Sequence, residues 1–135
     1  MDLQISFDDT VGETEGIALY RSNGWSAAEK PVQLLAALRN SHSLVTARLS
    51  GELVGLANAI SDGHLAVYFP HMLVAPALQK RGIGRRMMEA LVGKYRTFHQ
   101  LMLTADLKAV GFYERLGFSR AGRTQPMWIY GGTEH

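Results

Sequence analysis

A basic, glycine-containing loop between a strand and a helix constrains this chain more than any other feature. Residues 64–74 predict a long strand that Pro70 interrupts, and residues 82–96 predict the strongest helix. A helix start carries unpaired backbone N–H groups and the positive end of the helix dipole, so it favours an anion. We therefore expect an anion-binding site in the connecting loop, Gln79-Lys80-Arg81-Gly82-Ile83-Gly84-Arg85.

The residue types in this loop suit phosphate better than they suit the common nucleotide motifs. Gly82 and Gly84 carry no side chain where a phosphate oxygen would meet the backbone. A Walker loop needs Gly-Lys followed by Ser or Thr, but Arg85 follows Gly84. The dinucleotide fingerprint needs a third glycine or alanine, and this chain has Met87 there. The structural alternative is an ordinary strand-to-helix loop.

The rest of the pattern predicts a mixed α/β domain that spans residues 1–135. Alternating or β-rich segments predict strands at 3–7, 43–49, 53–60, 99–105 and 126–130. Helical spacing with suitable caps predicts helices at 14–23, 31–39 and 107–116. We expect the tail from Gly131 to His135 to fray.

The composition excludes several classes of protein. With 47% hydrophobic and 19% charged residues the chain is globular, and without cysteine it has no disulfide scaffold or cysteine nucleophile. The five histidines lack metal-like spacing, so we expect no metal. Because no apolar run is long enough for a membrane helix and the start does not resemble a signal peptide, we expect a cytoplasmic protein that binds no membrane.

Positive charge is concentrated in one segment although the net charge is only +2. Residues 79–96 carry six bases and one acid, which suits an anionic ligand or a solvated helix face. A nucleic-acid binder would need aromatic side chains for base stacking. The one aromatic residue of this stretch, Tyr95, lies on the apolar stripe of the helix, so we expect no nucleic-acid partner.

Two motifs give the chain a family resemblance. Val74-x-Pro76-x-x-Gln79-x-x-Gly82-Ile83-Gly84 resembles the acyl-CoA signature of the GCN5-related N-acetyltransferases, the GNAT family. Asp106-x-x-Ala109-x-x-Phe112-Tyr113-x-x-x-Gly117-Phe118 resembles the second signature of that family. Leu19-Tyr20-x-x-x-Gly24-Trp25 and Ala105-Asp106 are similar to its aralkylamine acetyltransferase-like branch.

The resemblance implies a fold and a reaction. We expect a twisted mixed sheet, splayed at its centre and flanked by about four helices, with acetyl-CoA in the splay. The implied activity is N-acetylation of a primary amine by direct attack in a ternary complex. A non-catalytic CoA-binding sensor or interaction module is the alternative. The sequence does not identify the amine, and a homodimer is a further implication of the family.

The resemblance also assigns residues to the cofactor. Backbone groups of one strand would bind the pantetheine arm and polarise the thioester near Leu73, and the loop N–H groups would bind the pyrophosphate. Asp106 stands where the family commonly has Asn, and an ionised Asp only accepts hydrogen bonds, so a capping role is the alternative. The implied cofactor-binding residues are Met72, Leu73, Val74, Gln79, Lys80, Arg81, Gly82, Ile83, Gly84, Arg85, Asp106 and Phe112.

Two further residues are implied in catalysis. Tyr113 lies on an apolar helix face, and its hydroxyl would protonate the departing thiolate unless it is a bonded core group. His71 would accept the proton of the amine, because histidine titrates near neutral pH. His64, Tyr68 and water are lesser candidates for this base.

Substrate recognition is expected from the N-terminal helices. Tyr20 and Trp25 could form an aromatic wall for the amine or attract its cation. Packing in the core or in a lid is the alternative for both residues.

Overall fold

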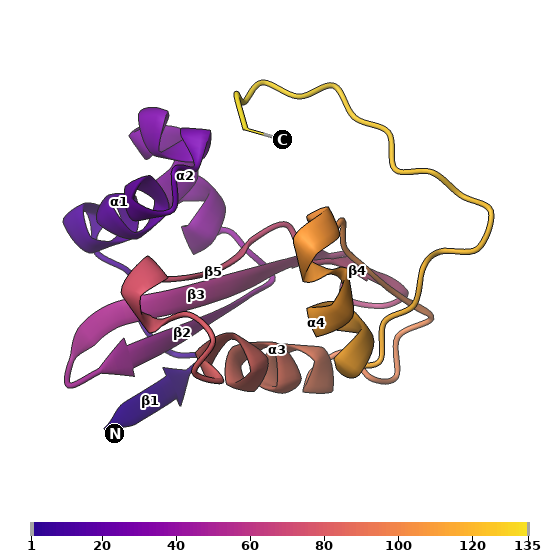
Figure 1. Cartoon of the computed structure of the whole chain (residues 1–135), viewed down its shortest axis with the longest axis horizontal. Coiled ribbons are helices and arrows are strands. Elements are labelled where there is room, and N and C mark those ends of the chain that lie inside the picture. The colour runs from indigo at the N-terminus through magenta and orange to yellow at the C-terminus, as the bar shows by residue number, and fades with distance from the viewer. Residues whose placement is uncertain (1, 135) are drawn as a thin grey trace.

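Two helices cover each face of a six-stranded sheet in the computed structural model, which describes residues 2–134 (Figure 1). The strands are β1 (Leu3–Ser6), β2 (Ser43–Leu49), β3 (Glu52–Ser61), β4 (Ala66–Tyr68), β5 (Met72–Val74) and β6 (Gln100–Met102). The helices are α1 (Glu13–Ser22), α2 (Pro31–Arg39), α3 (Ile83–Gly93) and α4 (Val110–Arg115), with 3₁₀ turns η1 (Ser26–Glu29), η2 (Pro76–Leu78) and η3 (Leu107–Ala109).

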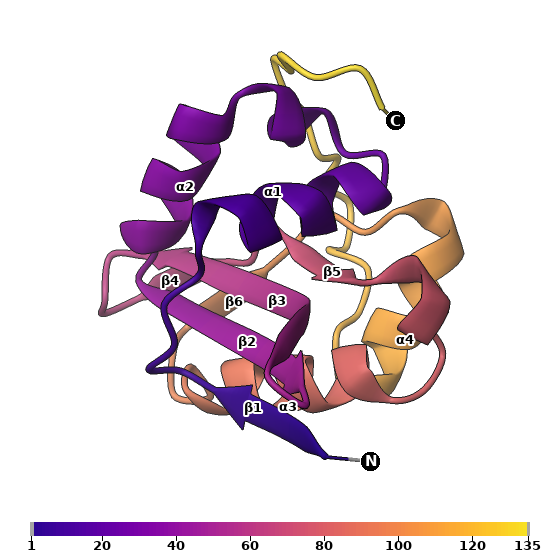
Figure 2. The same cartoon turned by 90° about the vertical axis from the view of Figure 1, so that its left-hand side faces the viewer.

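The hydrophobic core is divided by the sheet. Leu19, Leu34 and Leu56 belong to the cluster beneath α1 and α2, and Figure 2 shows these helices together on one side of the strands. Met87 and Leu91 of α3 belong to the cluster on the opposite face, against which α4 also packs. Burial of these apolar stripes holds the layers together.

The sheet is open and splayed, as the family resemblance implied. Its order is β1-β2-β3-β4-β6, with antiparallel pairs except for the parallel pair β4–β6. Strand β5 pairs with β3 alone among the described strands. The sheet therefore divides beyond β4, where β5 continues along β3 and the chain after β6 turns away towards α4.

The predicted strand 64–74 is two strands separated by a bulge. Between the pairs Ile60–Tyr68 and Ala57–Met72, β3 advances three residues while the other chain advances four. The extra residue falls around Pro70, which has no N–H to donate to the ladder. The bulge places His71 between β4 and β5 rather than within a strand.

The predicted strand 126–130 is wrong, because this segment pairs with no described strand. A turn with a bond from Thr124 N–H to the Ala121 carbonyl precedes it, and the chain then runs along the outside of the molecule (Figure 1). We call residues 125–134 the C-terminal arm. Apolar, β-branched and aromatic residues favour extended backbone, but pairing also needs a sheet edge within reach.

The expectation that the tail frays is also wrong for Gly131–Glu134. Both carboxylate oxygens of Glu134 accept from the Ser26 backbone N–H, at 3.0 and 3.1 Å. The Thr133 N–H donates to the Ser26 hydroxyl. The end of the arm is therefore attached to η1, and the expectation for His135 lies outside the described residues.

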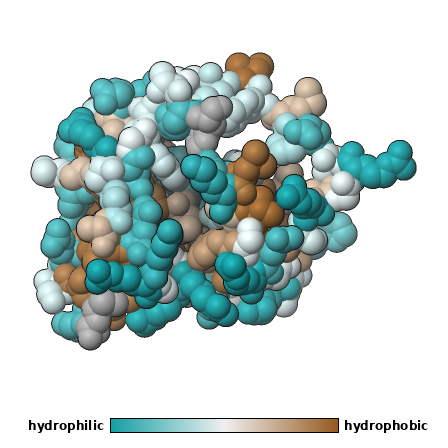
Figure 3. Space-filling view, viewed as in Figure 1, coloured by the Kyte–Doolittle hydropathy of each residue, from teal (hydrophilic) through white to brown (hydrophobic). Residues whose placement is uncertain are grey.

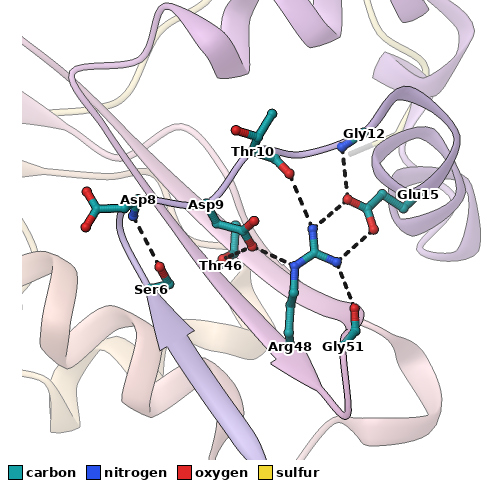
Figure 4. A network of polar contacts seen from close by, with 9 residues as sticks. All are labelled: Ser6, Asp8, Asp9, Thr10, Gly12, Glu15, Thr46, Arg48 and Gly51. Carbon is teal, nitrogen blue, oxygen red and sulfur yellow. Dashed lines mark hydrogen bonds and ion pairs between the residues drawn. The ribbon is translucent and has the colours of Figure 1, made fainter.

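A charged cluster fixes the start of α1 against β2 (Figure 4). Arg48 of β2 contacts Asp9 at 2.7 Å and Glu15 at 2.6 Å. Burial alone would raise the pKa of Asp9, but hydrogen bonds from Arg48 and Thr46 outweigh it and lower that pKa. The Arg48 hydrogen bond likewise lowers the pKa of Glu15. This cluster therefore holds in place the helix that carries Tyr20.

Candidate active site

The outer edge of β5 offers backbone groups to a ligand. An antiparallel strand bonds to its neighbour through every second residue, and bonds to β3 at the His71 carbonyl and the Ala75 N–H fix this alternation. Leu73 is therefore paired with β3, whereas Met72 and Val74 direct their N–H and C=O groups away from it. The backbone N–H expected near Leu73 to polarise the thioester is therefore that of Met72 or Val74.

The start of α3 presents a row of N–H groups beside this edge. Gly82 has φ +87° and Lys80 has φ +64°, so the loop turns sharply before the helix. Within the part of the chain described, the first helical bond runs from Arg86 N–H to the Gly82 carbonyl, and Ile83, Gly84 and Arg85 lack a backbone acceptor. Such a helix start can hold a pyrophosphate.

Two side chains of the loop, those of Gln79 and Arg85, already bond to other groups of the protein. The Gln79 amide donates to the Val74 carbonyl and to Asn23 Oδ1, each at 3.1 Å. Arg85 forms an exposed ion pair with Glu89 at 2.6 Å. Gln79 thus links the loop to β5 and α1, and the anion site is built chiefly from backbone.

Gly84 brings three elements together. A Cβ placed there would lie 3.3 Å from the sulfur of Met72 and 3.6 Å from the ring of Phe112. Strand β5, the first turn of α3 and helix α4 therefore meet at this glycine. The structure thus joins both sequence signatures at one site.

Tyr113 supplies a hydroxyl with no hydrogen-bond partner among the described residues. Its ring packs at right angles to those of Phe112 and Phe118. Burial raises the pKa of Tyr113 to about 12, so the phenol keeps its proton at neutral pH. The alternative of a bonded core hydroxyl therefore finds no support.

Asp106 performs the capping role that the sequence allowed. Its carboxylate accepts from the Lys108 N–H at 2.9 Å, at the start of η3. The predicted helix 107–116 accordingly begins as a 3₁₀ turn and continues as α4. Capping satisfies one of the N–H donors that this helix start leaves unpaired.

The structure brings His71, Tyr20 and Trp25 into one aromatic cluster. The three rings lie 5.2–5.7 Å apart with edge-to-face geometry. Tyr20 has no exposed surface, so it cannot form the substrate wall proposed from sequence. Its hydroxyl instead lies 2.7 Å from His71 Nδ1. Burial lowers the pKa of His71, and this ring is therefore neutral at physiological pH.

Two residues near His71 escaped sequence analysis. Asn58 is buried in β3, and its side-chain oxygen accepts from the His71 backbone N–H at 3.2 Å. Glu134 of the C-terminal arm favours the charged form of His71 and so opposes the effect of burial on its pKa, which burial still lowers. The sequence did carry a signal for Asn58, which is a polar residue within an apolar strand. Nothing in the sequence indicates that Glu134 acts on His71, 63 positions earlier in the chain.

Other features of residues 2–134 lie away from this site. A cavity of about 310 Å³ lies beside α2, lined by residues such as Phe7, Arg39 and His42, and contains no predicted site residue. No cluster of three or more potential metal-ligating side chains occurs in this part of the chain. None of its helices is long and apolar enough to cross a membrane.

Several proteins with this splayed architecture are named acetyltransferases. A GNAT-family acetyltransferase from Streptococcus pneumoniae superposes with a TM-score of 0.82 and 28% identity over 96% of this chain and 98% of its own. The model described as "Acetyltransferase (GNAT) domain" matches residues 15–127. The chain therefore belongs to the GNAT acetyltransferase family.

Curated relatives agree with this assignment. An uncharacterised N-acetyltransferase of Gracilaria tenuistipitata is 28% identical over 87% of this chain and 68% of its own length. A histone acetyltransferase of Glycine max is 34% identical over 75% of this chain. The matched region covers 49% of the length of that relative. These names describe the relatives, and the shared property is acetyl transfer.

Proposed function

We propose that this protein transfers the acetyl group of acetyl-CoA to a primary amine and belongs to the aralkylamine acetyltransferase-like branch. The observation that carries the proposal is the meeting of β5, the α3 start and α4 at Gly84. Support comes from the outward backbone groups of β5, the open start of α3 and the Tyr113 hydroxyl, which follows Phe112 on α4 and has no partner among the described residues. These features suit pantetheine, pyrophosphate and a departing thiolate in turn.

The reaction needs no acyl-enzyme. The amine nitrogen attacks the thioester carbonyl carbon, a C–N bond forms and the C–S bond breaks. An outward N–H of Met72 or Val74 stabilises the carbonyl oxygen as charge develops there, and Tyr113 donates a proton to the sulfur. The amine releases its own proton to water or to His71, the base suggested by the sequence. Holding both reactants together supplies much of the acceleration.

Binding and turnover are tested separately. Acetyl-CoA should raise the melting temperature, because a ligand bound only by the native state stabilises it, and adenosine alone should do so less. Release of free thiol in an amine library then measures transfer. Stabilisation without thiol release from any amine would favour the CoA-binding module. No stabilisation by acetyl-CoA would contradict the central proposal.

We further propose a homodimer with a small-molecule amine as substrate, in the cytoplasm. Support for the dimer comes from the C-terminal arm, where four consecutive large apolar residues are exposed: Met127, Trp128, Ile129 and Tyr130. Figure 3 shows a hydrophobic patch beside an opening between the arm and the body of the molecule. Strand β6 is also an open edge among the described strands. A second copy would cover both features.

A further inference from the structure

The hydroxyl of Tyr20 is buried with a single hydrogen-bond partner. Tyr20 has 0% exposure, and its oxygen lies 2.7 Å from His71 Nδ1. No other acceptor for this hydroxyl occurs among the described residues. Burial raises the pKa of Tyr20 well above its ordinary value, so the phenol keeps its hydrogen.

The number of hydrogens on the two groups determines which one donates in the bond between Tyr20 and His71. A neutral imidazole has one protonated nitrogen and one acceptor nitrogen. If Nδ1 carried the hydrogen and donated to Tyr20, the phenol hydrogen would be buried without an acceptor, which folded proteins avoid. If Tyr20 donates to Nδ1, both groups are satisfied and the ring hydrogen is on Nε2.

We infer that Tyr20 is a positioning residue that fixes His71 as the Nε2–H tautomer. The free nitrogen of His71 is then a hydrogen-bond donor rather than a proton acceptor, which assigns the amine proton to water. This role within catalysis rests on the proposed function, but the tautomer itself does not. Such a donor suits a substrate or thioester group that carries an accepting oxygen.

The surroundings of His71 agree with this inference. The titratable groups acting on the ring are Tyr20 from α1 and Glu134 from the C-terminal arm. Trp25 packs against it from the start of η1, and Asn58 holds its backbone N–H from β3. The ring is therefore contacted by Tyr20 and Trp25, while β3 holds the backbone that carries it.

A second histidine–tyrosine pair provides an internal control. His42 Nδ1 also lies 2.7 Å from a tyrosine hydroxyl, that of Tyr95. Tyr95, however, donates its hydrogen to the Ser43 hydroxyl at 2.6 Å. Tyr95 can therefore only accept from His42, and neutral His42 should be the Nδ1–H tautomer. The two pairs share one geometry and have opposite expected tautomers.

Nitrogen chemical shifts test the inference without any substrate. In a long-range ¹H–¹⁵N correlation spectrum recorded where both rings are neutral, His71 should show protonated Nε2 and His42 protonated Nδ1. Tyr20→Phe should move the His71 signals towards a tautomer mixture, while Tyr95→Phe should alter only His42. Protonated Nδ1 at His71 in the wild-type protein would overturn the inference, even if Tyr20→Phe did not fold.

Activity then tests the role of the donor. Gln can donate through its amide but cannot serve as a base. His71→Gln should therefore retain more activity than His71→Ala, which should lose about tenfold to a hundredfold, as expected for one lost hydrogen bond. If both variants lost activity equally, and the fall in activity at low pH seen in the wild type disappeared, His71 would instead be the base. Absence of activity in the wild type would contradict the proposed function and leave the tautomer result intact.

Discussion

At the scale of single residues, Tyr113 provides the sharpest distinction between catalysis and packing. Its hydroxyl has no partner among the described residues, so Tyr113→Phe should leave stability almost unchanged. Turnover should fall by roughly 10²–10⁴, the usual contribution of a positioned general acid. Acetyl-CoA affinity should change little, because the lost contact forms mainly in the transition state. Melting temperature, binding and turnover of one variant check all three points.

Tyr95→Phe is the matched control. This residue is 1% exposed, and its hydroxyl, unlike that of Tyr113, bonds to the side chains of His42 and Ser43. Its loss should cost about 1–3 kcal/mol of stability, because buried partners are left unpaired. Turnover should be retained at a temperature where the variant is folded. Tyr113→Phe with turnover within about twofold of wild type would remove Tyr113 from the role of acid.

At the scale of elements, α3 tests where the anion binds. Gly84→Asp places a carboxylate at the helix start beside Met72 and Phe112, where it would repel a pyrophosphate and disturb packing. Acetyl-CoA affinity should fall at least about tenfold, since one repelled charge is worth more than 1.4 kcal/mol in a dry site. Calorimetric titration measures the change.

Gly93→Asp introduces the same charge at the other end of α3. No heavy atom lies within 4 Å of a Cβ at Gly93, so the side chain can be accommodated. Affinity for acetyl-CoA should stay at the wild-type value in this variant. Equal loss of affinity in both variants would indicate a general effect of charge rather than a site at the helix start.

The attachment of α1 to β2 should make stability depend on pH. The pKa values of Asp9 and Glu15 are lowered in the folded state. Their contribution is therefore present above the ordinary carboxyl pKa of about 4 and is lost as the pH falls through the lowered values. Arg48→Met should cost about 1–3 kcal/mol at pH 7 and flatten this acid limb.

Melting temperatures between pH 3 and 7 check this prediction. Arg85→Met is the control, because its ion pair with Glu89 is exposed at 59% and 53% and should contribute little. A wild-type melting temperature that does not fall as the pH is lowered would contradict the stabilising role given to Asp9 and Glu15. So would an Arg48→Met profile with the same slope as the wild type.

At the scale of the whole molecule, the C-terminal arm should determine the oligomeric state. Light scattering after gel filtration should give a dimer for the wild type and a monomer for the double variant Met127→Asp, Ile129→Asp. These side chains are 91% and 106% exposed, so the substitutions should not unfold the domain. Val32→Asp, at an 81% exposed position of α2, should stay dimeric. A monomeric wild type would contradict the proposed dimer.

Local patterns were sufficient for most elements of the fold. Pro31 at the first position of α2 and the apolar residues at every third or fourth position specify that helix, and its bounds match the prediction. Gly82 at φ +87° provides the conformation that the loop before α3 requires. The sequence thus determined the order of elements, the α/β class and the two signatures.

Only the tertiary structure decided which groups meet. The bulge at Pro70 arises from a one-residue difference between two pairings with β3, and it determines that Met72 and Val74, rather than Leu73, face the splay. Residues 126–130 join no sheet although their residue types favour extended backbone. Strand propensity is a local property, whereas a pairing partner must come from the sheet edge of another segment. The roles of Tyr20 and Glu134 also depend on contacts between distant residues. Burial, bond direction and charge environment arise only when the chain is packed, and sequence spacing does not specify them.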